Sequence, residues 1–107
     1  MTNTIHHKLK KLNMKKKILI VFGTRPEAIK LAPLIVALRN QPLQFKLLIC
    51  VTAQHRELLD QVLKVFEIKP NIDLNLMKQN QDLFEITANI QLQMKKILNK
   101  HKPDAVI

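Results

Sequence analysis

Residues 18–34 read ILIVFGTRPEAIKLAPL and bring together an apolar run, the only glycine of the chain and a helical pattern. The run 18–22 is continuous and rich in β-branched residues, which is typical of a parallel strand buried on both faces. The segment 26–40 repeats apolar residues at helical spacing, namely Ala28, Leu31, Ala32, Ile35 and Leu38. Pro33 removes one helical hydrogen bond inside this segment, so we expect a kink near Ile29. The stretch therefore predicts a buried strand, a short loop and a helix.

The same alternation continues along the chain. It predicts a buried strand at 46–52, a helix at 55–66, a short strand near a sheet edge at 72–77, a helix at 83–100 and a buried fourth strand beginning in KPDAVI, residues 102–107. The apolar faces expected on the two later helices are Leu58, Leu59, Val62, Leu63 and Phe66, and then Leu83, Ile86, Ile90, Met94 and Ile97. Asp82 is placed to cap the last helix. This alternation predicts an α/β fold with a Rossmann-like parallel sheet, flanking helices and right-handed crossovers.

The positive charge of the chain lies at its two ends. The net charge is +10, of which residues 1–17 carry six lysines and no acid, and residues 95–107 carry four lysines and Asp104. The middle, 18–94, has eight basic and seven acidic residues. Basic ends bind phosphates non-specifically or keep a chain soluble, and both interpretations stay open. With no Trp or Tyr and four Phe, the composition argues against a stacking platform for single-stranded nucleic acid.

The length of 107 residues allows one domain at most. Residues 1–14 lack apolar periodicity, so we expect a detachable, disordered basic leader, and Met14 is a second candidate start. A complete doubly wound sheet normally has five or six strands. We therefore expect residues 15–107 to be an incomplete N-terminal Rossmann-like domain, with a second domain absent.

Two further features have plain interpretations. Cys50 lies in an apolar run, cannot form an internal disulfide, and is expected to be a buried hydrophobe in a reducing compartment. His6 and His7 have no cysteine or acidic partner at ligand spacing, so we expect no metal site. No signal core or membrane-spanning run is present, and we expect the cytoplasm.

The loop after the first strand is the candidate ligand site. Parallel α/β sheets bind ligands at the carboxyl ends of their strands. Gly23 allows a positive φ and close approach of a ligand, and Pro26 suits a first helical turn capped by Thr24 or Arg25. A helix N-terminus favours anions, Arg25 adds a forked guanidinium, and Lys30 is a further cation about one turn on. These residues predict a phosphate or diphosphate site.

An ordinary strand-to-helix turn explains the same residues equally well. Arg25 could pair with Glu27, and Lys30 could be solvated. The loop matches neither G-x-G-x-x-G nor G-x-x-x-x-G-K-[ST], so neither a dinucleotide cofactor nor ATP hydrolysis by a P-loop is supported.

Two long blocks resemble a known family. FGTRPEAIKLAPL, residues 22–34, and VTAQHRELLDQVLKVFEIKPNIDLNLM, residues 51–77, resemble the N-terminal part of the bacterial non-hydrolysing UDP-N-acetylglucosamine 2-epimerases. The resemblance covers about 15–107. It implies a glycosyltransferase-B-like fold of two Rossmann-like domains with the active site between them. It also implies interconversion of UDP-GlcNAc and UDP-ManNAc for cell-envelope polysaccharides, by elimination and re-addition of UDP.

The resemblance also implies roles for individual residues. Arg25 and Lys30 would contact the nucleotide-sugar, beside the loop of Gly23 and Thr24. In some relatives a second UDP-GlcNAc acts as an activator, and Gln54 and His55 are candidates for that site. Alternatively, His55 and Arg56 merely open the second helix. The catalytic aspartate and the other acid–base groups of the family align beyond Ile107, so His55 is not expected to be the base. The 107-residue chain alone is therefore expected to be inactive.

Partners follow from the same resemblance. We expect a UDP-sugar substrate, no cofactor or metal, and a homodimer in the full-length enzyme, with no specific nucleic-acid partner and no membrane partner. Two alternatives remain. One is a non-catalytic basic binding module that uses its lysine-rich ends on nucleic acid or anionic membrane, with binding that would weaken with salt and survive Arg25→Ala. The other is a truncated remnant without function.

Overall fold

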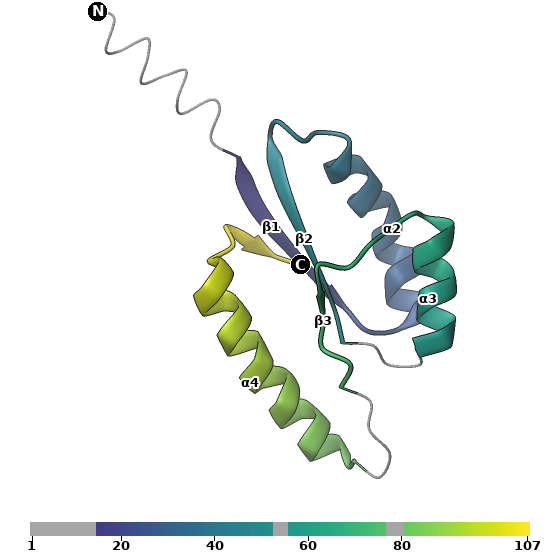
Figure 1. Cartoon of the computed structure of the whole chain (residues 1–107), viewed down its shortest axis with the longest axis vertical. Coiled ribbons are helices and arrows are strands. Elements are labelled where there is room, and N and C mark those ends of the chain that lie inside the picture. The colour runs from purple at the N-terminus through teal and green to yellow at the C-terminus, as the bar shows by residue number, and fades with distance from the viewer. Residues whose placement is uncertain (1–14, 53–55, 77–80) are drawn as a thin grey trace, which may run out of the picture.

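The computed structural model describes residues 15–52, 56–76 and 81–107. The elements are strand β1 (Lys16–Phe22), helix α2 (Arg25–Arg39), strand β2 (Phe45–Val51), helix α3 (Arg56–Val65), strand β3 (Ile72–Asp73), helix α4 (Leu83–His101) and strand β4 (Ala105–Val106). The strands form one parallel sheet in the order β3-β2-β1-β4 (Figure 1). The predicted α/β class with a parallel sheet and flanking helices is confirmed.

Strand β1 lies inside the sheet and separates two apolar cores. Its odd and even positions point to opposite faces. Ile18, Ile20 and Phe22 pack with α2 and α3, whereas Leu19 packs with Ile97 of α4. Helices α2 and α3 therefore cover one face and α4 covers the other, so the described chain has three layers (Figure 1).

Helices α2 and α3 pack side by side and are joined at their C-terminal ends. On α2 the predicted stripe is correct, because Ala28, Ala32 and Ile35 are buried and Leu31 and Leu38 are partly buried. The guanidinium of Arg39 donates to the carbonyl oxygens of Phe66 (3.3 and 3.4 Å) and Glu67 (2.8 Å). Pro33 does not end the helix, which runs through it to Arg39.

Four expectations about burial and strand length are wrong. Leu83 is 74% exposed, because the first turns of α4 extend beyond the strands in Figure 1 and its fully buried residue is Ile97. Leu58 is exposed, since the stripe of α3 consists of Leu59, Val62 and Leu63. Of the described residues 72–76, only Ile72–Asp73 form a strand, which does lie at a sheet edge. The predicted buried fourth strand is exposed instead, because β4 is an edge strand that, among the described residues, pairs with β1 alone.

Asp82 is the predicted cap of α4, and its carboxylate accepts from the backbone N–H of Glu85 at 2.7 Å. No helix in the described ranges is long and apolar enough to cross a membrane.

Candidate functional site

The sheet order identifies the edge at which a ligand would bind. Strand β1 lies between β2 and β4, so the helices that follow β1 and β2 lie on the face opposite to α4. In parallel α/β sheets, ligands bind at the carboxyl ends of the strands where the chain order reverses. Here that position is beyond the ends of β1 and β4. The loop 23–24, which follows β1, lies at this point.

Helix α2 begins with a side-chain cap at this edge. Thr24 is the N-cap residue, with φ −120° and ψ 160°. Its hydroxyl donates to the Glu27 carboxylate at 2.6 Å and accepts from the Glu27 N–H at 3.5 Å. Pro26 lies in the first turn and has no N–H, as predicted. In the described part of the chain, the backbone N–H of Arg25 is therefore left as the first-turn donor without a protein acceptor.

Gly23 serves this loop through its missing side chain. The sequence suggested a positive φ, but Gly23 does not have one, and it is buried. A hydrogen bond ties this turn to the end of β2, because the N–H of Thr52 donates to the carbonyl of Phe22 at 3.0 Å. The loops after β1 and β2 are thus fixed together, and the glycine leaves room for close approach.

The two predicted cations are placed differently. Arg25 is the first residue of α2, is exposed, and lines a hollow of about 380 Å³ together with Ile29 and residues of α3. Lys30 is also exposed, but five positions later it lies about 140° further around the helix. Among the described residues Arg25 makes no ion pair or side-chain hydrogen bond, and Glu27 contacts Thr24 instead. The structure thus leaves Arg25 available to an anion and gives no contact that unites it with Lys30.

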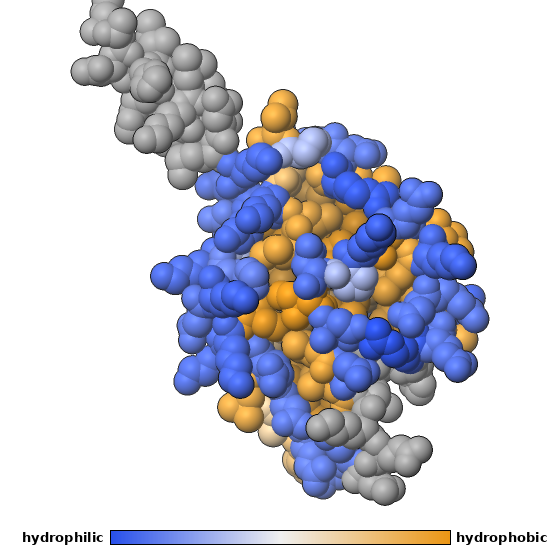
Figure 2. All heavy atoms as spheres, in the orientation of Figure 1, coloured by the Kyte–Doolittle hydropathy of each residue, from blue (hydrophilic) through white to orange (hydrophobic). Residues whose placement is uncertain are grey.

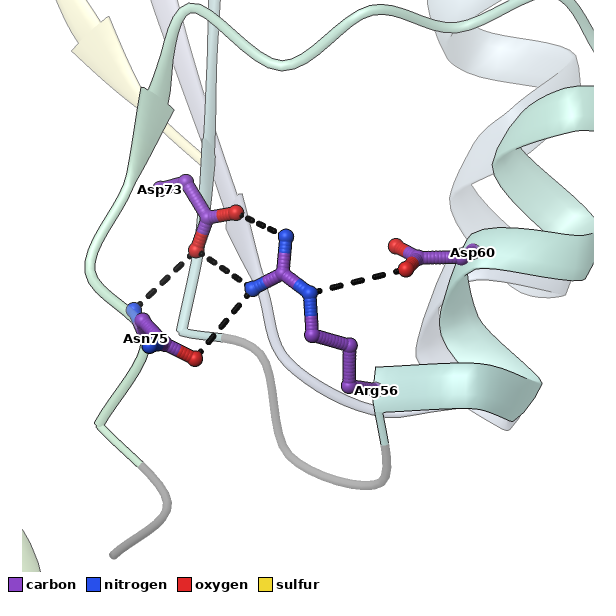
Figure 3. Close-up of polar contacts among 4 residues, drawn as sticks. All are labelled: Arg56, Asp60, Asp73 and Asn75. Atoms are coloured by element: carbon purple, nitrogen blue, oxygen red, sulfur yellow. Dashed lines mark hydrogen bonds and ion pairs between the residues drawn. The ribbon is translucent and has the colours of Figure 1, made fainter.

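A second arginine at the same edge is fully committed to protein acceptors (Figure 3). Arg56, the first residue of α3, forms a bidentate ion pair with Asp73 of β3, with Nη1 to Oδ1 at 3.2 Å and Nη2 to Oδ2. Nη1 also donates to Asn75 Oδ1 at 3.2 Å, and Nε lies 3.5 Å from Asp60 Oδ2. Because every guanidinium nitrogen has a partner, Arg56 is a structural cation that joins α3 to β3.

This cluster could not be recognised from sequence spacing alone. Only the Arg56–Asp60 pair has the local signature of a helical i, i+4 contact. Asp73 is 17 residues from Arg56, and the two meet only because β3 pairs with the end of β2. Arg56 therefore opens helix α3, which is the alternative that the sequence allowed for it.

The ion pair sets the protonation of Asp73, and we predict an acid dependence of stability from it. Hydrogen bonds from Arg56 favour the carboxylate and lower the pKa of Asp73 below its ordinary value near 4. A folded-state pKa below the unfolded one stabilises the fold above about pH 4, and the stabilisation is lost as pH falls through the folded pKa. Urea unfolding between pH 7 and 3 should show a smaller loss for Asp73→Asn than for the unaltered chain. Identical pH slopes would contradict this.

Several residues singled out in the sequence lie outside the described ranges, and one described residue, Cys50, is not suited to catalysis. Gln54, His55, His6 and His7 lie outside the described residues. Among the residues that the structure describes, no three His, Cys, Asp or Glu side chains gather as metal ligands. Cys50 is buried, and burial raises the pKa of its thiol to about 11, so it is a core residue and not a nucleophile.

Comparison with known proteins identifies similar sequences. A family model described as UDP-N-acetylglucosamine 2-epimerase matches residues 36–107. The UDP-N-acetylglucosamine 2-epimerase of Campylobacter jejuni is 56% identical over 95 residues, which are 88% of this chain and 24% of that protein. The enzyme of the same name from Escherichia coli K12 is 58% identical over 91 residues, covering 85% of this chain and 24% of the relative.

Solved structures agree with these matches. The UDP-GlcNAc 2-epimerase of Neisseria meningitidis bound to UDP-GlcNAc superposes with a TM-score of 0.78 at 56% identity, over 84% of this chain and 24% of that one. A putative UDP-N-acetylglucosamine 2-epimerase from Listeria monocytogenes gives a TM-score of 0.80 at 48% identity, over 87% and 24%. The chain thus spans about a quarter of the length of its relatives. A match that spans 88% of this 107-residue chain extends over residues 23–30, which precede the family-model match.

Proposed function

The chain belongs to the UDP-N-acetylglucosamine 2-epimerase family, and from this we propose that it forms the diphosphate-binding part of an enzyme that interconverts UDP-GlcNAc and UDP-ManNAc. Residues 15–107 would be part of the first of two Rossmann-like domains, with the active site between them. The full enzyme would act as a homodimer in the cytoplasm, in the synthesis of cell-envelope polysaccharide. The single buried Cys50 fits a reducing compartment.

The proposed reaction inverts C2 of the sugar through an intermediate. A base removes the C2 proton, the bond between C1 and the diphosphate oxygen breaks, and UDP leaves as an anion from a 2-acetamidoglucal. UDP then re-adds and a proton returns to the other face of C2. Negative charge grows on the diphosphate as the C1–O bond breaks, so fixed positive charge at that group lowers the barrier.

One observation carries this proposal: the free cation at the start of α2. The Arg25 side chain is exposed and unpaired among the described residues. Its own backbone N–H, at the start of α2 just beyond β1, has no acceptor among them either. A guanidinium and a helix N-terminus together suit two phosphate oxygens. The nearby Arg56 is already saturated by Asp60, Asp73 and Asn75, so it does not compete for the ligand.

The other residues singled out in the sequence have supporting roles in this proposal. Lys30 would reach the nucleotide-sugar from a different side of α2, and Gln54 and His55 would border an activator site. No residue of 1–107 is assigned the removal of the C2 proton, because the acid–base groups of the family align beyond Ile107. No metal or nicotinamide enters the proposed scheme.

An exchange of segments tests this function. Residues 15–107 replace the matching quarter of the Escherichia coli enzyme, which is 58% identical in this region. We expect the chimera to epimerise UDP-GlcNAc at a rate within about tenfold of the parent, whereas the 107-residue chain alone shows none. Conversion is followed by chromatographic separation of UDP-GlcNAc and UDP-ManNAc. A folded, dimeric chimera without activity would contradict the proposal.

A further inference from the structure

The fold brings together two lysine-rich segments that lie far apart in the sequence. At the amino edge of the sheet, the N–H of Lys17 donates to the Asp104 carboxylate at 2.7 Å, and the N–H of Asp104 donates to the carbonyl of Lys17 at 2.7 Å. The ammonium of Lys17 donates to the carbonyl of His101 at 2.7 Å. The start of β1 is therefore bound to the end of α4.

These contacts create one strongly basic surface, which we call the lysine edge. It consists of the lysines of the β1 start, of the neighbouring β2 start and of the last turns of α4, namely Lys15, Lys16, Lys17, Lys46, Lys95, Lys96, Lys100 and Lys102. All except Lys17 are exposed. Asp104 is the carboxylate among them, so the lysine edge has a formal charge of +7. Figure 2 shows hydrophilic side chains along this margin, over α4 and the start of β1.

The residue types of the lysine edge point to a partner recognised by charge alone. It contains no arginine and no aromatic residue, whereas nucleic-acid readers combine arginine forks with aromatic stacking. Two of the three arginines are bound to protein acceptors: Arg39 to carbonyls just after α3, and Arg56 to Asp73 of β3. The exposed Phe84 lies at the opposite end of α4. Lysines are hydrated point charges, and clusters of about 4–8 of them hold proteins at anionic lipid surfaces.

We propose that the lysine edge is an electrostatic docking surface for anionic phospholipid headgroups. The family resemblance implied no membrane partner, whereas the alternative of a basic binding module took the two lysine-rich ends as separate segments. Folding joins these ends into one surface. The lysine edge lies about 20 Å along β1 from the ligand loop after Phe22, as six residue steps in a strand require. A chain docked by this edge would therefore keep the loop facing away from the bilayer. This proposal does not depend on the proposed enzymatic function.

Vesicle sedimentation tests the proposal with matched pairs of variants. The 107-residue chain is mixed with phosphatidylcholine vesicles, with or without phosphatidylglycerol, at low and high salt. Lys96→Gln with Lys100→Gln removes two exposed charges from the lysine edge, and Lys64→Gln with Lys69→Gln removes two exposed charges elsewhere. We expect binding only to the anionic vesicles, weakened by salt, and about 10-fold weaker for the first pair. The second pair should change it less than about twofold.

Each other outcome overturns the proposal. Equal effects of the two pairs would mean that net charge or the leader, and not this surface, is responsible. Absence of binding to anionic vesicles at low salt would show that the lysine edge does not dock to lipid headgroups. Tighter binding to a duplex RNA than to the vesicles would assign the edge to nucleic acid. Lys15→Gln with Lys16→Gln, at the start of β1, serves as a second edge pair, and circular dichroism confirms that every variant is folded.

Discussion

Arg25→Ala lowers kcat/KM for UDP-GlcNAc about 100- to 1,000-fold in the chimeric enzyme that carries residues 15–107. This is the loss expected when one preorganised donor is removed from the charge that develops in a transition state. Arg25 is suited to that role because it has no protein partner among the described residues and stands at an uncapped N–H of α2. The effect should appear in kcat as well as in KM, because the charge on the departing UDP grows during the reaction.

Two matched variants separate this role from a general loss of positive charge. Arg25→Lys keeps the charge but loses the fork, so we expect it to recover only part of the activity. Arg39→Ala removes an arginine whose guanidinium donates to the Phe66 and Glu67 carbonyls, and it should leave kcat/KM within about threefold once the protein is folded. If Arg25→Ala also stays within threefold, α2 does not bind the diphosphate through this residue.

Phe22→Ala destabilises the chain by about 3–5 kcal/mol, the usual cost of removing a buried aromatic side chain. Phe22 ends β1, is 1% exposed and, among the described residues, has the largest fully buried side chain. Its ring packs in the core beneath α2 and α3, so its removal leaves a cavity that the flanking helices cannot fill without moving. Single domains are stable by only about 5–15 kcal/mol, so most of the stability could be lost.

Urea unfolding followed by circular dichroism measures this cost, and the chain supplies its own control. Phe84→Ala removes the same side chain from a site that is 83% exposed, so the free energy of unfolding should change by less than about 0.5 kcal/mol. Equal effects of the two substitutions would mean that the core under α2 is not packed as described.

The regular elements could be predicted closely because their signals are local. The β-branched run of β1 and the helical spacing of α2 depend on neighbouring residues, and both elements were located to within two positions. Thr24 and Glu27 have the spacing of a capping box, so the choice between Thr24 and Arg25 as the cap could have been made from sequence.

The remaining features depend on contacts between distant segments. The exposure of Leu83 follows from where the sheet ends beneath α4, which no local pattern shows. Arg56 meets Asp73 only through the pairing of β3 with β2. The lysine edge likewise requires β1 and α4 to meet. The sequence therefore indicated the candidate loop after β1 and the arginine that begins α2, but left open whether Arg25 pairs with Glu27. It gave no sign of the Arg56–Asp73 pair beside them.

The position of β1 between β2 and β4 has a consequence for the order of folding. Lys16 pairs with Phe45, 29 residues later, whereas Ile18 pairs with Ala105, 87 residues later. Closing the longer loop costs about 1 kcal/mol more chain entropy, and contacts distant in sequence form more slowly. We therefore expect β1, α2 and β2 to assemble as an early unit, with the β4 pairing added last. During synthesis, the candidate loop after β1 would then be shaped before β4 joins the sheet.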